Sequence, residues 1–104
     1  MENQHRKITG YRELIPEEID LMNRIKAKGA ELLQLQAELV GRLSTDTEVK
    51  RADANRAGPS HATSESLEWE RFRAAEPQRW AAIGKTDIQT GIMALVRAVA
   101  QPTV

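Results

Sequence analysis

Apolar residues recur at steps of three, four and seven between residue 16 and about residue 43, the spacing typical of one face of an α-helix. One stripe consists of Leu21, Ile25, Leu32, Leu35, Leu39 and Leu43. A second stripe beside it consists of Ile19, Met22, Leu33 and Val40. A helix with two apolar stripes needs two neighbours, which is more than a single hairpin supplies. We therefore expect a long helix over 16–43 in a protein that assembles into a homo-oligomer.

The start of this helix has the expected chemistry. Pro16 suits a first helical position, where its missing N–H has no partner to lose, and Glu17 and Glu18 follow at the positive end of the helix dipole. Gly29 interrupts the middle of the pattern. It predicts either a kink or the close approach of another backbone or a ligand.

The sequence changes character after residue 43. Residues 44–63 contain no apolar stripe, and Gly58-Pro59 marks a break. We interpret this segment as a polar connector, of which the part before the break can be helical. Ser64 or Ser66 can cap a short helix over 64–76.

A last helix is predicted over 77–101, because Pro77 can open it and Pro102 follows its end. Its apolar positions are Trp80, Ile83, Ile88, Ile92, Leu95, Val96 and Val99. No stretch shows the alternation of a strand. The predicted class is all-α, with two long antiparallel helices and a short one in a single domain, 1–104, preceded by an N-terminal arm over 1–10.

Composition removes several classes of function. The net charge is zero, from 15 basic and 15 acidic residues, so DNA or RNA is not an expected partner. There is no cysteine, and His5 and His61 lie far apart, so neither a metal site nor a cofactor is expected. The polar N-terminus and the lack of a long apolar run predict a cytoplasmic protein without a membrane segment.

The stretch "IGKTDIQTG" contains Gly84-Lys85-Thr86, which are the last three letters of a phosphate-binding P-loop. That loop needs an earlier glycine at the position that Arg79 occupies here, and it must follow a strand. The residues before Gly84 instead have a helical pattern. We therefore reject a P-loop, and we expect Lys85 and Thr86 to project from a helix.

Other residues could meet an anionic ligand from these helices. Thr86, Gln89, Thr90, Met93 and Arg97 share a face distinct from the apolar stripe, which is either an ordinary solvated face or a polar wall for a ligand. Lys26 borders an apolar stripe, as a snorkelling lysine or as a phosphate partner. Tyr11, the only tyrosine, either packs on the helix start or stacks on a nucleobase.

Two blocks, "YRELIPEEIDLMNRIKAKGAEL" and "RWAAIGKTDIQTGIMALVRAVAQP", resemble the phage anti-CBASS family of cyclic-oligonucleotide sponges. The resemblance implies a small helical protomer in a homohexamer that acts in the cytoplasm of the infected bacterium. It implies binding, without cleavage, of cyclic dinucleotides such as cyclic GMP-AMP, and for some members of cyclic trinucleotides at separate sites. It assigns base stacking to Tyr11 and phosphate pairing to Lys26. Chemistry alone adds four candidate contacts, namely Arg79, Lys85, Thr86 and Gln89.

Two other functions compete with a sponge. A phosphodiesterase would need a metal or a placed acid–base pair, and Asp87 is the only acidic residue of the last helix, so no enzyme and no catalytic residue is expected. The main alternative is a helical oligomeric adaptor or structural protein with no small-molecule ligand. An adaptor would keep its function when Tyr11 and Lys26 are replaced.

Overall fold

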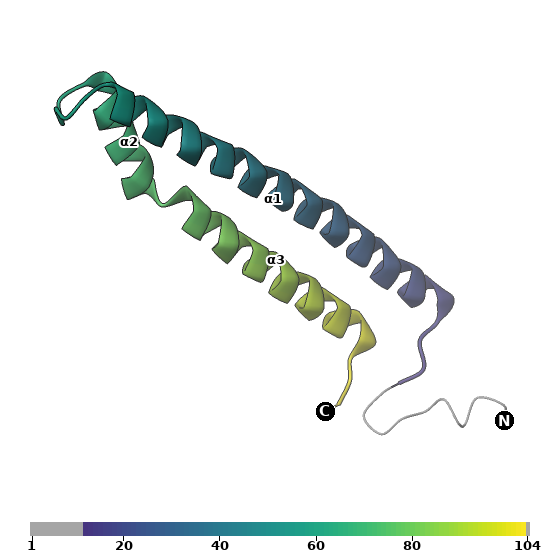
Figure 1. The fold of residues 1–104 in the computed structure, drawn as a ribbon. Coiled ribbons are helices and arrows are strands. Elements are labelled where there is room, and N and C mark those ends of the chain that lie inside the picture. Colours follow the sequence, from purple (N-terminus) through teal and green to yellow (C-terminus); the bar gives the residue numbers. More distant parts are fainter. Residues whose placement is uncertain (1–11, 104) are drawn as a thin grey trace. The chain divides into compact units, whose positions relative to one another are not determined.

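The computed structural model describes residues 12–103, which form three α-helices in chain order (Figure 1). These are α1 (Pro16–Arg56), α2 (Ser64–Ala75) and α3 (Pro77–Ala100). The all-α class with two long helices and a short one is confirmed, and no strand occurs within the described range. Tyr11 and the arm predicted over 1–10 lie outside the described residues.

Helix α1 begins where the sequence predicts. The carbonyl of Ile15 accepts hydrogen bonds from the backbone N–H groups of Glu18 at 3.0 Å and Ile19 at 3.1 Å. The Glu18 carboxylate reaches back and accepts from the N–H of Ile15 at 3.1 Å. This reciprocal pairing satisfies donors that a helix start otherwise leaves without partners.

Helix α1 ends at Arg56, well beyond the end predicted at about Leu43. The continuation follows from its inner face, where Thr47, Lys50 and Ala54 follow buried Leu43 at steps of four and three. These side chains are buried or half-buried although they are polar or small. The part of the segment over 44–63 that could be helical before the break is thus helical to Arg56, and the linker shrinks to 57–63.

Helix α2 is capped by Thr63, not by Ser64 or Ser66 as predicted. The Thr63 hydroxyl accepts a hydrogen bond from the N–H of Ser66 at 3.0 Å. At its other end, Glu76 adopts the left-handed conformation, with φ 49° and ψ 52°, and its N–H bonds the carbonyl of Arg73. Pro77 then starts α3, so a single residue separates the two helices.

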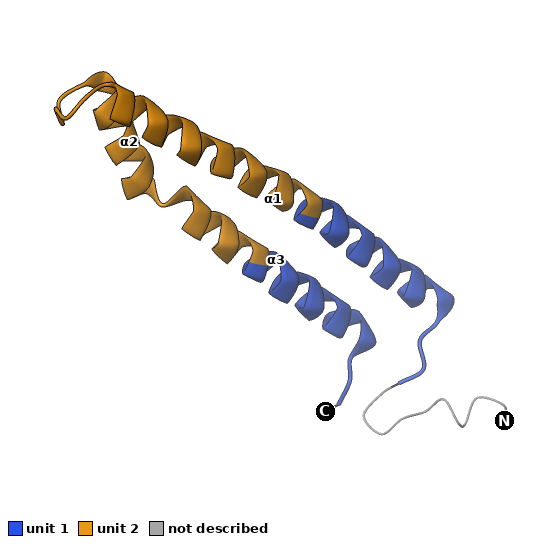
Figure 2. Ribbon diagram, viewed as in Figure 1, with its two compact units in different colours: residues 1–33, 86–104 blue, residues 34–85 orange. Residues whose placement is uncertain are grey.

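The chain divides into two compact units (Figure 2). The first unit contains the N-terminal part of α1 up to Leu33 and the part of α3 from Thr86 onward. The two helices approach closely at Gly29, where an added Cβ would lie 2.1 Å from Cδ1 of Ile92. The close approach predicted at Gly29 is thus made by a side chain, and α1 continues through this position.

The second unit spans residues 34–85. Its core consists of Leu43, Phe72 and Ala81, with Trp69 packed against them. The rings of Trp69 and Phe72 stack with centroids 6.3 Å apart. The amide of Gln36 donates to the carbonyl of Ala81 at 3.0 Å, which adds a polar tie between α1 and α3 within this unit.

No helix in the described range combines the length and the apolar character needed to cross a membrane.

Candidate functional site

One flank of the first compact unit is an open apolar groove of about 640 Å³. Leu32 keeps 49% of its surface exposed, and Leu95 keeps 55%. Six large apolar side chains line the groove, namely Leu21, Ile25, Leu32, Ile88, Ile92 and Leu95. A single protomer therefore leaves this apolar surface in contact with water.

Lys26 lies on the other flank of the same unit. Successive residues of an α-helix are rotated by about 100° around its axis. Lys26 is therefore turned away from the side of α1 on which Ile25 and Leu32 line the groove. The same geometry on α3 turns Gln89 away from the side of Gly91 and Leu95. Both side chains are exposed. The fold thus places a lysine cation and an amide on one flank, opposite the apolar groove.

The remaining predicted contacts do not join this pair. Thr86 is exposed in the first unit, whereas Arg79 and Lys85 belong to the second. The Arg79 guanidinium lies 5.4 Å from the centroid of the Trp80 ring, and its Nη1 is 3.5 Å from Oε2 of Glu76. Lys85 is also exposed.

No hydrogen bond or ion pair within residues 12–103 links any two of the predicted site residues. Tyr11, the predicted stacking residue, lies outside that range.

Sequence reasoning missed Arg12, which directly follows Tyr11 in the chain. Its Nη2 donates to Oε2 of Glu18 at 2.5 Å and to the carbonyl of Val99 at 2.7 Å. The hydrogen bond from Arg12, and next the one from the backbone of Ile15, lowers the pKa of the Glu18 carboxyl. The opposite charges of Arg12 and Glu18 were visible in the sequence, but the contact with Val99 depends on the folded arrangement.

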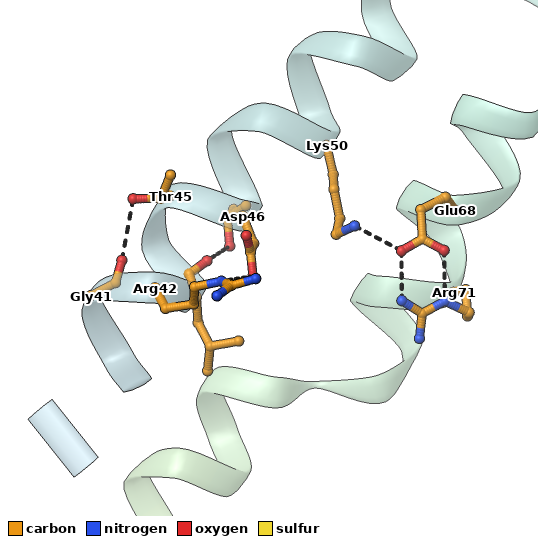
Figure 3. A network of polar contacts seen from close by, with 9 residues as sticks. Gly41, Arg42, Thr45, Asp46, Lys50, Glu68 and Arg71 are labelled. Carbon is orange, nitrogen blue, oxygen red and sulfur yellow. Dashed lines mark hydrogen bonds and ion pairs between the residues drawn. The ribbon is translucent and has the colours of Figure 1, made fainter. Parts of the chain in front are cut away.

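A second polar cluster ties α1 to α2 in the second unit (Figure 3). The Glu68 carboxylate pairs with Arg71 at 2.6 Å and with Lys50 at 2.8 Å. Hydrogen bonds from Arg71 first, and then from Lys50, lower the pKa of Glu68 from 4.5 to about 2. The Lys50 ammonium also lies 5.6 Å from the centroid of the Phe72 ring. These groups already pair with each other, so we assign them a role in packing.

The side chains of the described residues do not form a group of three or more metal-binding types that could hold an ion.

Two comparisons with known proteins bear on this arrangement. The model of the family described as the Acb2/Tad1 hairpin domain matches residues 3–100. Anti-CBASS protein 2 of Pseudomonas phage JBD67 is 69% identical over 105 residues, covering 98% of this chain and 97% of that protein. Both findings confirm the resemblance seen in the two sequence blocks. The chain belongs to the Acb2/Tad1 hairpin-domain family.

Proposed function

We propose that this protein binds and sequesters the cyclic dinucleotide signals of bacterial CBASS immunity without cleaving them, and so protects an infecting phage. The observation that carries the proposal is the 69% identity, over nearly the whole chain, to a phage protein named Anti-CBASS protein 2. Cyclic GMP-AMP is the proposed ligand type. Cyclic trinucleotides are a second ligand class to test.

The flank that contains Lys26 and Gln89 suits such a ligand. A lysine ammonium pairs with phosphate as a point charge, and an amide can bond a base edge or a phosphate oxygen. Tyr11 adds a stacking surface for a base. Arg79, Lys85 and Thr86 stay proposed contacts on the chemistry of their side chains alone.

A cyclic dinucleotide presents two phosphates and two bases, and one protomer offers a single Tyr11. Two copies related by a two-fold axis would double every contact and match the symmetry of the ligand. The open apolar groove supports self-assembly in general, because a second copy of the chain would remove Leu32 and Leu95 from water; it lies opposite the flank with Lys26 and so is not the contact that shares the ligand. We propose a hexamer as the full assembly, in the cytoplasm of the host bacterium.

The proposal is tested by titrating the purified protein with cyclic GMP-AMP in a calorimeter. The complex is then denatured by heat, and the released nucleotide is identified by chromatography. Tight binding with intact nucleotide supports sequestration. Recovery of cleaved nucleotide would mean an enzyme, and no binding across a panel of cyclic di- and trinucleotides would favour the helical adaptor.

Three variants locate the site. Tyr11→Ala should weaken binding by about 10- to 100-fold, since stacking on a base contributes roughly 1–3 kcal/mol. Lys26→Ala should weaken it by a similar factor, because one phosphate loses its counter-charge. Arg51→Ala is the control, since within residues 12–103 Arg51 pairs only with Glu48 of its own helix, at 2.8 Å. Equal affinity in all three variants and the parent would refute this assignment.

A further inference from the structure

We propose that Met93 contacts the face of a nucleobase in the bound cyclic nucleotide and adds to the affinity of the site. The inference rests on the proposed function, because it adds a residue to the flank that contains Lys26 and Gln89. All three residues belong to the first compact unit. Met93 supplies an apolar contact, whereas Lys26 supplies a charge and Gln89 supplies hydrogen bonds.

Met93 is unusually open to water for a residue of its kind. Its side chain keeps 70% of its surface exposed, more than any other large apolar residue within 12–103. Isolated exposed apolar residues are common on protein surfaces, so exposure alone does not indicate a site. The neighbours on the helix distinguish Met93, because it shares a face of α3 with the exposed polar residues Thr86, Gln89 and Thr90.

Helix geometry turns Met93 away from the apolar groove. Residues four apart in an α-helix differ by about 40° around its axis, so Met93 follows Gln89 on the same side of α3. Residues two apart differ by about 200°, so Met93 and Leu95 project from opposite sides. Leu95 lines the groove. A second copy of the chain in the groove would therefore cover Leu95 and leave Met93 open to a ligand.

Met93 also lies at nearly the same level along the helices as Lys26. In the first unit α1 and α3 run in opposite directions, since the residue that precedes the start of α1 bonds the last turn of α3 (Figure 2). Gly29 and Ile92 face each other across the two helices. Lys26 is three residues from Gly29, and Met93 is one residue from Ile92 toward the same end. At 1.5 Å per residue, the two levels differ by about 3 Å, so a nucleotide paired with Lys26 can reach Met93.

A methionine thioether suits the face of a base. The side chain is unbranched and has three rotatable bonds, so it can adapt to a flat ring. Contacts between sulfur and aromatic rings are favourable by an amount that corresponds to about a threefold to tenfold change in affinity. Every base has such a face, so Met93 adds affinity without selecting one base. The amide of Gln89 can bond a base edge and would supply the selectivity.

Substitutions at Met93 test the contact in a calorimetric titration. Met93→Ala should weaken binding of cyclic GMP-AMP by about threefold to tenfold. Met93→Leu keeps an apolar side chain of similar volume and should recover most of the affinity. Leu67→Ala is the matched control and should bind like the parent, because Leu67 is also exposed, at 57%, but belongs to α2 in the second unit. Parent-like affinity in Met93→Ala would overturn the inference.

Light scattering after size-exclusion chromatography separates a lost ligand contact from a lost contact between copies. Met93→Ala should have the same mass as the parent, since Met93 does not line the groove. A smaller mass would overturn the inference, because Met93 would then support the assembly instead of holding a base.

Oxidation of the methionines gives a second readout that needs no variant. Hydrogen peroxide transfers one oxygen atom to an exposed thioether, which becomes a sulfoxide while the peroxide is reduced to water. Mass spectrometry of peptides should show faster oxidation of exposed Met93 than of half-buried Met22. Saturation with cyclic GMP-AMP should slow the oxidation of Met93 several-fold.

The outcomes of this experiment keep the two proposals apart. Absence of protection at Met93 in a protein that binds cyclic GMP-AMP would overturn the inference and leave the proposed function in place. A parent that binds no cyclic nucleotide would overturn the proposed function together with the inference that rests on it.

Discussion

Two glycines of α1 show how the same residue type has opposite roles. At Gly29 an added Cβ would lie 2.1 Å from Cδ1 and 2.6 Å from Cγ1 of Ile92. At Gly41 an added Cβ would meet nothing within 4 Å. Gly29 therefore allows close packing within the first unit, while Gly41 only weakens its helix.

We expect Gly29→Ala to lower the free energy of unfolding by about 1–2 kcal/mol, because the clash with Ile92 exceeds the gain in helix propensity. Gly41→Ala should raise it by up to about 1 kcal/mol, since it adds propensity alone. Urea unfolding followed by circular dichroism measures both changes. Equal shifts in the two variants would show that the Ile92 contact does not matter.

The Glu68 carboxylate gives the second unit a defined dependence on pH. Its pKa is lowered to about 2 in the folded protein, so the stabilisation that it provides is present above its ordinary pKa of 4.5. That stabilisation is lost as the pH falls toward 2. We expect the melting temperature to drop over this interval, and Glu68→Gln to reduce the drop.

The control for this experiment is Glu70→Gln on the same helix, where the partner Arg73 lies 3.4 Å away within α2. Melting curves from pH 7 to pH 2.5 should separate the two variants. A parent-like pH dependence in Glu68→Gln would contradict the assignment.

At the scale of whole elements, the apolar pattern was enough to predict three helices and their order. It failed at the end of α1, because the inner face after Leu43 continues with Thr47, Lys50 and Ala54 rather than with large apolar residues. The aromatic rings of Trp69 and Phe72 on α2 fill the space opposite. A search for apolar residues alone therefore misses the part of α1 where the large core side chains come from α2.

For the candidate site, the sequence proposes contacts that stay predictions. Lys26 could be proposed from its place beside an apolar stripe, and Gln89 from its place on a face distinct from that stripe. Arg12 could not be proposed, because its contact with Val99 joins segments 87 positions apart. Contacts of that kind leave no periodic signal in a single sequence.

The bend between α2 and α3 depends on Glu76, which is in the left-handed region with φ 49°. A residue with a Cβ is strained there by roughly 1–2 kcal/mol, whereas glycine is not. We expect Glu76→Gly to be more stable than Glu76→Ala by about 1 kcal/mol. Both variants lose the contact with Arg79, so the difference between their thermal unfolding curves reports the backbone effect alone. A more stable alanine variant would contradict this expectation.

At the scale of the whole molecule, the chain exposes more apolar surface than a monomer needs. The groove of about 640 Å³ is one such surface, and within the described residues nothing covers its exposed leucines. Net charge is zero, so electrostatic repulsion between copies offers little opposition to association. These properties favour the proposed self-assembly.

We expect Leu32→Lys to shift the assembly toward monomer, because a charge buried without a partner costs several kcal/mol. Leu67→Lys is the matched control, since Leu67 is exposed to a similar degree, 57% against 49%, but does not line the groove. Light scattering after size-exclusion chromatography gives the mass of each variant. An unchanged mass for Leu32→Lys would exclude the groove as the contact between copies.

The hydrogen bond from Arg12 to the carbonyl of Val99 has a consequence for the order of folding. Gln36 and Ala81 are 45 positions apart, whereas Arg12 and Val99 are 87 apart, so closing the second contact from an unfolded chain costs about 0.6 kcal/mol more. Contacts nearer the turn between α1 and α2 therefore form first and shorten the later loops. The end of the hairpin that holds the contact between Arg12 and Val99 therefore closes last and opens first. Local fraying at that end leaves the turn between α1 and α2 intact.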